Sequence, residues 1–208
     1  CFVVDGVHFV KFSLADLGHG FLEHLAHGVD GDVRAAHGGN GVGKQLFHRR
    51  CRRQVALQDD GWYLRSDIVW NKPNAMPESV KDRPARSHEF LFMLTKSEKY
   101  YYDWQAVREP ADGGGLRNRR SVWHVNTKPF AGAHFATFPP DLIRPCIQVS
   151  TEPGDYVLDP FFGSGTVGLV CQDENRQYVG IELNPEYVAL AADRLQGQDS
   201  NVIRIAAA

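Results

Sequence analysis

Short apolar runs alternate with polar and glycine-rich segments along most of the chain, a pattern typical of an α/β protein. Runs rich in aromatic and β-branched residues predict strands, and apolar positions at helical spacing predict helices between them. The predicted strands are residues 62–70, 88–95, 99–103, 121–125, 155–158, 178–181 and 201–205. The predicted helices are residues 141–149, interrupted by Pro145, a helix that opens at 167–171, and a last helix that begins at 184–186.

The first 54 residues do not share this pattern. They hold most of the histidines, many glycines and a basic end at residues 48–53, and their apolar periodicity is poor. The histidine spacings match no standard ligand set, so we predict no metal site. We therefore divide the chain into an atypical segment, residues 1–54, and a domain over residues 55–208. The atypical segment is predicted to be poorly ordered or foreign to the domain.

One turn of the domain carries the clearest chemical signal. Residues 159–166, Asp-Pro-Phe-Phe-Gly-Ser-Gly-Thr, join a predicted strand to a predicted helix. Glycines at such a turn let backbone N–H groups approach a ligand with no Cβ in the way. Glu182 closes the next strand, and an acidic residue about 20 positions after such a turn suits the two hydroxyls of a ribose. The pattern predicts a site for a nucleoside cofactor.

The composition of the chain indicates in which compartment the protein works. No apolar run approaches the roughly 18 residues of a membrane span, and the start of the chain lacks the pattern of a signal peptide, so we expect no membrane partner. The cysteines lack Cys-x-x-Cys spacing, which favours reduced thiols and a cytoplasmic protein. The net charge of −2 hides two basic clusters, at residues 81–86 and 117–120.

Four blocks of the chain, in order, resemble the amino-methylating DNA methyltransferases of bacteria, in the class whose catalytic half precedes the cofactor half. The family's Asp-Pro-Phe-x-Gly-Ser-Gly-Thr motif is matched by residues 159–166, and its next acidic position by Glu182. The other blocks are residues 67–83, residues 88–103 and the His-Phe-Ala-Thr-Phe-Pro of residues 134–139. The resemblance covers about two thirds of the chain, from Ala56 to Leu195.

The resemblance implies a Rossmann-like methyltransferase sheet, incomplete at its N-terminal side, that uses S-adenosylmethionine. Its target-base side would be residues 55–125 and its cofactor side residues 126–208. The implied cofactor-binding residues are His134, Phe135, Ala136, Thr137, Phe138, Pro139, Asp159, Pro160, Phe161, Gly163, Ser164, Gly165, Thr166, Glu182 and Asn184. The implied residues beside DNA or the target base are Trp70, Lys72, Asn74, Lys81 and Arg83. Trp70 also has a plain alternative as a core aromatic.

The chain departs from the family at the loop on which the chemistry depends. In the family, Asp, Asn or Ser followed by Pro-Pro and an aromatic residue holds the extruded base and its amino group. This loop should lie upstream of Ala56, where the chain contains no proline. Pro139-Pro140 is followed by Asp141 and belongs to the cofactor side. Because the first residue of the missing loop normally indicates adenine or cytosine, the sequence leaves the target base open.

Two functions remain open at this point. One is a site-specific DNA methyltransferase that transfers a methyl group from S-adenosylmethionine to adenine N6 or cytosine N4 of double-stranded DNA. The other is a non-catalytic remnant that binds cofactor or DNA without turnover. The family's variable recognition segment corresponds at most to residues 104–120, which is short for reading base edges. The recognition sequence and the oligomeric state also stay open, with a dimer as one alternative.

Overall fold

The computed structural model describes residues 2–4, 7–12, 57–58, 60–128, 137–195 and 202–204, with the backbone alone for 2–4, 7–12 and 202–204. The chain divides into two compact units, Cys1–Phe12 with Tyr63–Ala208, and Ser13–Trp62. In the second unit, a helical turn at residues 57–58 leads into a turn closed by a 2.9 Å hydrogen bond from the Gly61 N–H to the Gln58 carbonyl. All the elements described below belong to the first unit.

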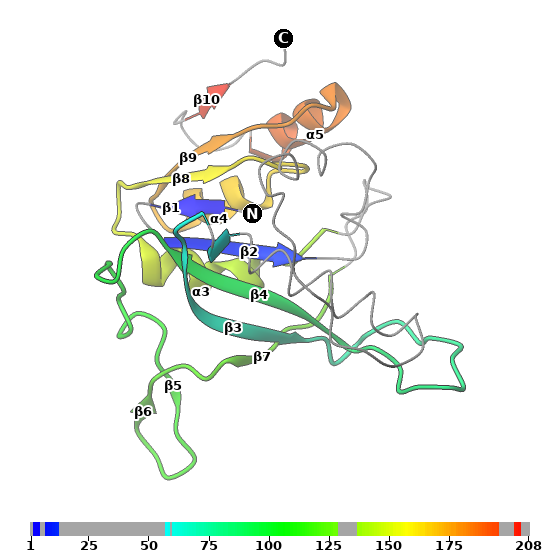
Figure 1. Cartoon of the computed structure of the whole chain (residues 1–208). Helices are drawn as coiled ribbons and strands as arrows, with labels where there is room; N and C mark the ends of the chain where they lie inside the picture. Colours follow the sequence, from blue (N-terminus) through cyan, green and yellow to red (C-terminus); the bar gives the residue numbers. More distant parts are fainter. Residues whose placement is uncertain are drawn as a thin grey trace. The chain divides into compact units, whose positions relative to one another are not determined.

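A mixed eight-stranded sheet forms the centre of the first unit (Figure 1). In spatial order its strands are β10 (Val202–Arg204), β9 (Gln177–Gly180), β8 (Tyr156–Asp159), β1 (Phe2–Val4), β2 (Val7–Phe12), β4 (His88–Thr95), β3 (Tyr63–Asn71) and β7 (Val122–His124). Strands β8, β9 and β10 are parallel to one another, as are β3 and β7. The pairs β8–β1, β1–β2, β2–β4 and β4–β3 are antiparallel.

In the described part of the chain, three helices follow residue 126: α3 (Pro140–Ser150), α4 (Thr166–Asp173) and α5 (Pro185–Leu195). Proline stands in the first turn of α3, where a missing N–H costs nothing. The apolar faces of α3 and α4 pack on one face of the sheet in a common core with Ile68 and Leu91 from β3 and β4. This packing, which removes apolar side chains such as Leu142 and Val167 from water, is the main stabilising contribution of the helices.

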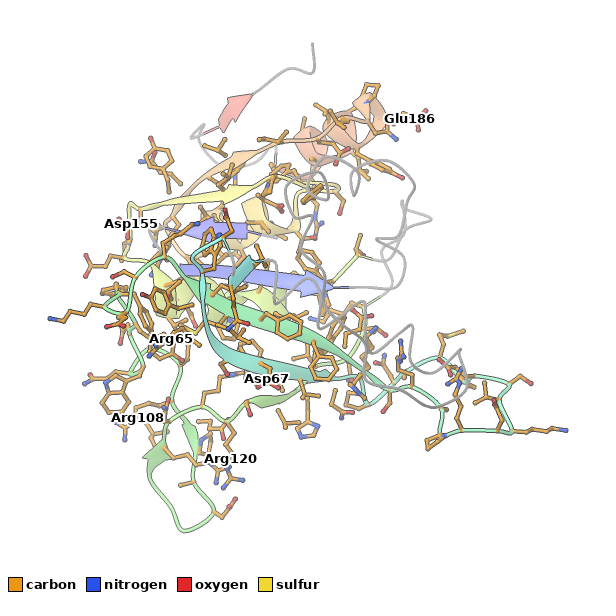
Figure 2. All side chains as sticks on the ribbon, in the orientation of Figure 1. Arg65, Asp67, Arg108, Arg120, Asp155 and Glu186 are labelled. Atoms are coloured by element: carbon orange, nitrogen blue, oxygen red, sulfur yellow. The ribbon has the colours of Figure 1, made fainter. Side chains whose placement is uncertain are left out.

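The strand directions bring the carboxyl ends of several strands to one edge of the sheet. Parallel strands β8 and β9 end there, and so does β3, because β3 runs antiparallel to β4 and β4 begins at this edge. We call it the carboxyl edge. In Figure 2, Asp155 at the start of β8 and Glu186 at the start of α5 lie on the left and the right of the view, which marks the carboxyl edge as the right side. In open α/β sheets ligands bind beyond this edge.

The fold confirms the predicted α/β class and most of the predicted elements. Pro145 does not interrupt α3, which continues to Ser150. The strand predicted at residues 99–103 is wrong, because these residues form bends and loop without ladder hydrogen bonds. Within residues 104–120, β5 (Glu109–Pro110) and β6 (Leu116–Arg117) form a short hairpin. None of the helices in the described part of the chain has the length and apolar character needed to span a bilayer.

The division at residue 55 stays a prediction. Strands β1 and β2 place the backbone of residues 2–4 and 7–12 in the sheet, between β8 and β4. The rest of the atypical segment lies outside the described residues.

Candidate functional site

The glycine loop, residues 160–165, joins the end of β8 to the start of α4 at the carboxyl edge. Gly163 and Gly165 have φ angles of 53° and 76°, in the left-handed region that favours glycine. The Gly165 N–H closes the turn by donating to the Phe162 carbonyl at 2.9 Å. Gly165 is also the N-cap of α4 and supplies no capping side chain. A ligand can therefore take the capping position, where the helix dipole favours negative charge or a strong acceptor.

Glu182, just beyond β9, is tied directly to this loop. Its Oε2 accepts a hydrogen bond from the Gly163 N–H at 2.8 Å, and its Oε1 accepts one from the Asn184 N–H at 2.9 Å. A carboxylate has about four lone-pair positions, so roughly two remain for other donors. The two backbone bonds fix the orientation of the carboxylate and leave acceptors for a pair of hydroxyl groups.

Phe162, which the sequence did not indicate as a site residue, anchors the glycine loop. Its ring stacks on Tyr178 with centroids 5.5 Å apart. A Cβ at Gly180 would lie 2.4 Å from the ring, and one at Gly168 would lie 2.8 Å from it. Both positions must therefore lack a side chain for the ring to fit. Glycines inside a strand and a helix are the signal that could have revealed this contact.

Asp159, the last residue of β8, is buried, with 3% of its surface exposed. Its Oδ1 accepts a hydrogen bond from the Phe161 N–H at 3.0 Å. Burial raises the pKa of Asp159 to about 6, and the nearby Glu182 carboxylate adds to the shift. The side chain thus shapes the turn from inside, while Glu182 presents the carboxylate that a ligand can reach.

Ser164 and Thr166 are also buried, and their hydroxyls face Arg194 of α5. By contrast, Phe161 and Leu183 are 55% and 81% exposed, and each is the neighbour in sequence of a residue that shapes the site. The nearest atom to a Cβ at Gly163 would be the Phe161 carbonyl oxygen, 3.9 Å away, so the backbone here is open. Open backbone, an oriented carboxylate and exposed apolar side chains fit a nucleoside cofactor with ribose hydroxyls and a flat base.

The predicted cofactor block at residues 134–139 is described only in part. His134, Phe135 and Ala136 lie outside the described residues. Phe138 packs against the core and Pro139 is buried, immediately before α3. Pro160 is half-buried in the glycine loop, and Asn184 caps α5 by accepting the Glu186 N–H at 2.9 Å.

At the other end of the carboxyl edge, Trp70 and Lys72 form a compact cluster with Glu89. Trp70 is 1% exposed, and its Nε1 donates to the Val125 carbonyl at 2.7 Å. The Lys72 ammonium forms an ion pair with Glu89 and lies 4.4 Å from the centre of the Trp70 ring. The indole is part of the core, and a direct contact of Trp70 with a target base stays a prediction.

Asn74 connects the loop after β3 to the segment after β7. Its Oδ1 accepts from the Thr127 N–H at 2.8 Å and from the Thr127 hydroxyl at 3.2 Å, and its Nδ2 donates to the Thr127 carbonyl at 2.9 Å. Lys128 then forms an ion pair with Asp141 of α3 at 2.6 Å. These contacts link the predicted target-base side to the predicted cofactor side.

The β3–β4 loop, residues 72–87, extends from the carboxyl edge and carries the remaining predicted residues (Figure 1). Lys81 and Arg83 are exposed, and Arg83 pairs with Glu78 at 2.8 Å. Hydrogen bonding to Arg83 holds the pKa of Glu78 below its usual value.

The glycine loop and the β3–β4 loop leave the carboxyl edge at different strands. The glycine loop follows β8 and the β3–β4 loop follows β3, and these strands are separated by β1, β2 and β4. The two loops therefore start about 19 Å apart, at roughly 4.8 Å per strand spacing.

Comparison with known proteins indicates the family to which the chain belongs. Residues 14–193 match the model of the DNA methylase family. The chain is 92% identical over 165 residues to the type II methyltransferase M.XycI of Xanthomonas campestris pv. cyanopsidis, covering 79% of this chain and 55% of that protein. It is 83% identical to M.Cfr9I of Citrobacter freundii over the same shares.

A solved structure described as the M1.HpyAVI–SAM complex superposes with a TM-score of 0.59 at 28% identity, covering 72% of this chain and 71% of that one. The present chain spans about 55% of the length of M.XycI and of M.Cfr9I. The residues that match the family model, 14–193, include the glycine loop, Glu182 and the β3–β4 loop. A family match over most of its length, with relatives at this identity, shows that the chain belongs to the DNA methylase family.

Proposed function

We propose that this chain binds S-adenosylmethionine at the glycine loop and presents it for transfer of a methyl group to an exocyclic amino group of adenine (N6) or cytosine (N4) in DNA. The observation that carries the proposal is the pair of hydrogen bonds from Gly163 and Asn184 to Glu182. These bonds hold an acceptor for ribose hydroxyls beside open backbone. The similarity to the solved structure of the M1.HpyAVI–SAM complex supports the choice of cofactor.

Each part of the site has a physical role in this proposal. Glu182 binds the ribose, and exposed Phe161 and Leu183 offer apolar surface to the adenine. The bound cofactor supplies an electrophilic methyl group. Amino-group methylation then requires mainly that the nitrogen lone pair be aligned with the methyl group, so positioning contributes more than proton transfer.

The β3–β4 loop is the part best suited to contact DNA. Residues 72–87 carry four basic and two acidic side chains, and the loop leaves the same edge at which the cofactor binds. Lys81 and Arg83 are exposed and would meet phosphate oxygens, which supply most of the salt-dependent affinity for DNA. A methyltransferase that acts on bacterial DNA would work in the cytoplasm, and we propose that location for this chain.

A second candidate is a cofactor-binding chain without turnover. The observation that favours it is the absence of proline from the first 72 residues, since the base-holding loop of the family needs Pro-Pro followed by an aromatic residue. Under this alternative, the cofactor and the DNA would still bind, but no methyl group would be transferred.

Two measurements separate the candidates. Titration calorimetry with S-adenosylmethionine tests the site, and transfer of a labelled methyl group to unmethylated double-stranded DNA tests turnover. Binding with incorporation supports the enzyme, and binding without incorporation supports the non-catalytic chain. Failure of the wild-type protein to bind the cofactor would reject both.

The variant Glu182→Gln tests whether S-adenosylmethionine binds at Glu182. It removes a charged hydrogen-bond acceptor worth about 1.5–3 kcal/mol, so the affinity for S-adenosylmethionine should fall about 10- to 100-fold. Glu186→Gln is the matched control, because Glu186 is exposed in the first turn of α5 and its loss removes the same charge. Equal affinities of the two variants would place the cofactor elsewhere.

A further inference from the structure

Arg194, in the last turn of α5, contacts the glycine loop and the first residue of α4 with a single nitrogen. Its Nη1 lies 3.0 Å from Oγ1 of Thr166, 3.1 Å from the carbonyl oxygen of Ser164 and 3.3 Å from Oγ of Ser164. Both acceptor side chains are buried, with 7% of Ser164 and 4% of Thr166 exposed. The guanidinium therefore contacts the chain on either side of Gly165.

The same helix also packs directly on Gly165. A Cβ at Gly165 would lie 3.1 Å from Cβ of Ala191 and 3.2 Å from Cδ1 of Leu195. Packing of Ala191 and Leu195 prevents the loop from moving toward α5, and the Arg194 hydrogen bonds oppose movement away from it. A segment with two left-handed glycines has many alternative conformations, and fixing it before the ligand arrives reduces the entropy lost on binding.

We propose that Arg194 is a positioning residue of the cofactor site, which holds the glycine loop in the conformation that presents its backbone to S-adenosylmethionine. This inference rests on the proposed cofactor, but its structural part concerns the free protein as well. A basic residue in the last turn of a helix ordinarily complements the helix dipole. The three contacts assign Arg194 a role in the neighbouring loop as well.

A second arginine of the domain provides a matched control. Arg176, just before β9 at the opposite edge of the sheet, donates from Nη2 to the Thr151 carbonyl at 2.8 Å and from Nε to the Thr151 hydroxyl at 3.0 Å. It also donates to the Glu174 carbonyl. Arg176 thus stabilises a turn away from the glycine loop, with as many hydrogen bonds as Arg194 makes to Ser164 and Thr166.

The test compares Arg194→Met and Arg176→Met by calorimetry with S-adenosylmethionine and by hydrogen exchange of the amides of residues 161–167 in the free proteins. We expect Arg194→Met to weaken binding at least about tenfold, the equivalent of one charged hydrogen bond, and to accelerate exchange in the loop. Arg176→Met should lower the melting temperature but change neither quantity. Arg194→Lys, which keeps the charge and one nitrogen donor group but lacks the planar guanidinium, should recover part of both.

Three results would overturn the proposal: unchanged exchange in the loop of Arg194→Met, unchanged cofactor affinity, or equal weakening by Arg176→Met. If Arg194→Met does not fold, the double variant Ser164→Ala with Thr166→Val removes the two hydroxyl acceptors instead and should give the same two changes. If the wild-type protein does not bind the cofactor, the proposed function fails, and the exchange measurement still decides whether Arg194 holds the loop.

Discussion

At the scale of single residues, the two carboxyl groups of the candidate cofactor site lie in different environments. Glu182 is partly exposed and held by two backbone N–H groups, whereas Asp159 is buried and receives one. Burial penalises the charged form of a carboxyl group, and each hydrogen bond to the carboxylate opposes that penalty. Asp159 therefore carries a cost in the folded state at neutral pH that should be visible in the stability of the protein.

We predict that Asp159→Asn becomes relatively more stable than the wild type as pH rises. The folded-state pKa of about 6 lies above the value of about 3.9 in an unfolded chain. The folded state therefore binds the proton more tightly, and its free energy of unfolding falls as pH rises from about 4 to about 6. Since Asn does not ionise, the difference between variant and wild type should grow by about 1 kcal/mol between pH 5 and pH 8.

Thermal melting of both proteins without cofactor, at pH 5 and pH 8, measures this difference. Asp112→Asn provides a control that should not vary over this range, because hydrogen bonding to Arg117 holds the pKa of the exposed Asp112 carboxyl below its usual value, so this group is ionised at both pH 5 and pH 8. A difference between Asp159→Asn and wild type that does not vary with pH would contradict the prediction.

At the scale of the elements, the glycine loop is positioned from β9, α4 and α5 together. Phe162 fills the space left by Gly180 of β9 and Gly168 of α4, and Arg194 of α5 holds the residues on either side of Gly165. The loop is therefore a shared surface of three elements. A change in any of these elements should appear at the cofactor site.

We predict that Gly180→Ala lowers both stability and cofactor affinity. The new methyl group would lie 2.4 Å from the Phe162 ring, which must move. Overpacking of this kind costs about 1–3 kcal/mol, and the displaced ring should carry the glycine loop with it. Chemical denaturation and calorimetry measure the two effects.

Gly113→Ala is the control for this variant, because no heavy atom lies within 4 Å of its added Cβ. The double variant Gly180→Ala with Phe162→Leu should be destabilised less than the sum of the two single changes, since the smaller side chain makes room for the methyl group. Additive effects would show that the two positions do not compete for the same space.

The elements themselves were largely predictable from sequence, and the contacts between them were not. The glycine motif predicted a strand, a turn and a helix, and the structure has β8, the glycine loop and α4 there, because a strand–turn–helix signal is local. The contacts of Phe162 and Arg194 were not predicted, because their partners are distant in sequence and the contacts depend on how β9 and α5 pack. The strand predicted at residues 99–103 failed for a related reason, since aromatic composition favours a strand only where a neighbouring strand is present.

At the scale of the whole domain, the carboxyl edge carries both the proposed cofactor site and the loop proposed to contact DNA. Asn74 and Thr127 join the β3–β4 loop to the segment that precedes α3, and Lys128 continues this link to Asp141. Resemblance alone placed Asn74 beside the target base. In the structure its amide is bonded to Thr127, and a direct contact of Asn74 with the base stays a prediction.

We predict that Lys81→Ala with Arg83→Ala weakens DNA binding and reduces its dependence on salt. Each lost phosphate contact should lower the slope of log K against log salt concentration by about 0.9, or about 2 for the pair. Fluorescence anisotropy with a labelled duplex at several salt concentrations measures the slope. Lys96→Ala with Lys99→Ala removes the same charge at the opposite edge, after β4, and should leave the slope closer to that of the wild type. Equal slopes for the two double variants would exclude a specific role for the β3–β4 loop.

The inward orientation of side chains in the glycine loop also bears on cofactor engineering. Phe162, Ser164 and Thr166 are committed to the interior of the domain, so replacing them to accommodate a modified cofactor would damage the fold before it altered selectivity. Phe161 and Leu183, by contrast, are exposed, so their side chains are not buried in the interior. A library that varies these two positions alone is therefore the rational starting point for accepting synthetic cofactors with an enlarged adenine ring.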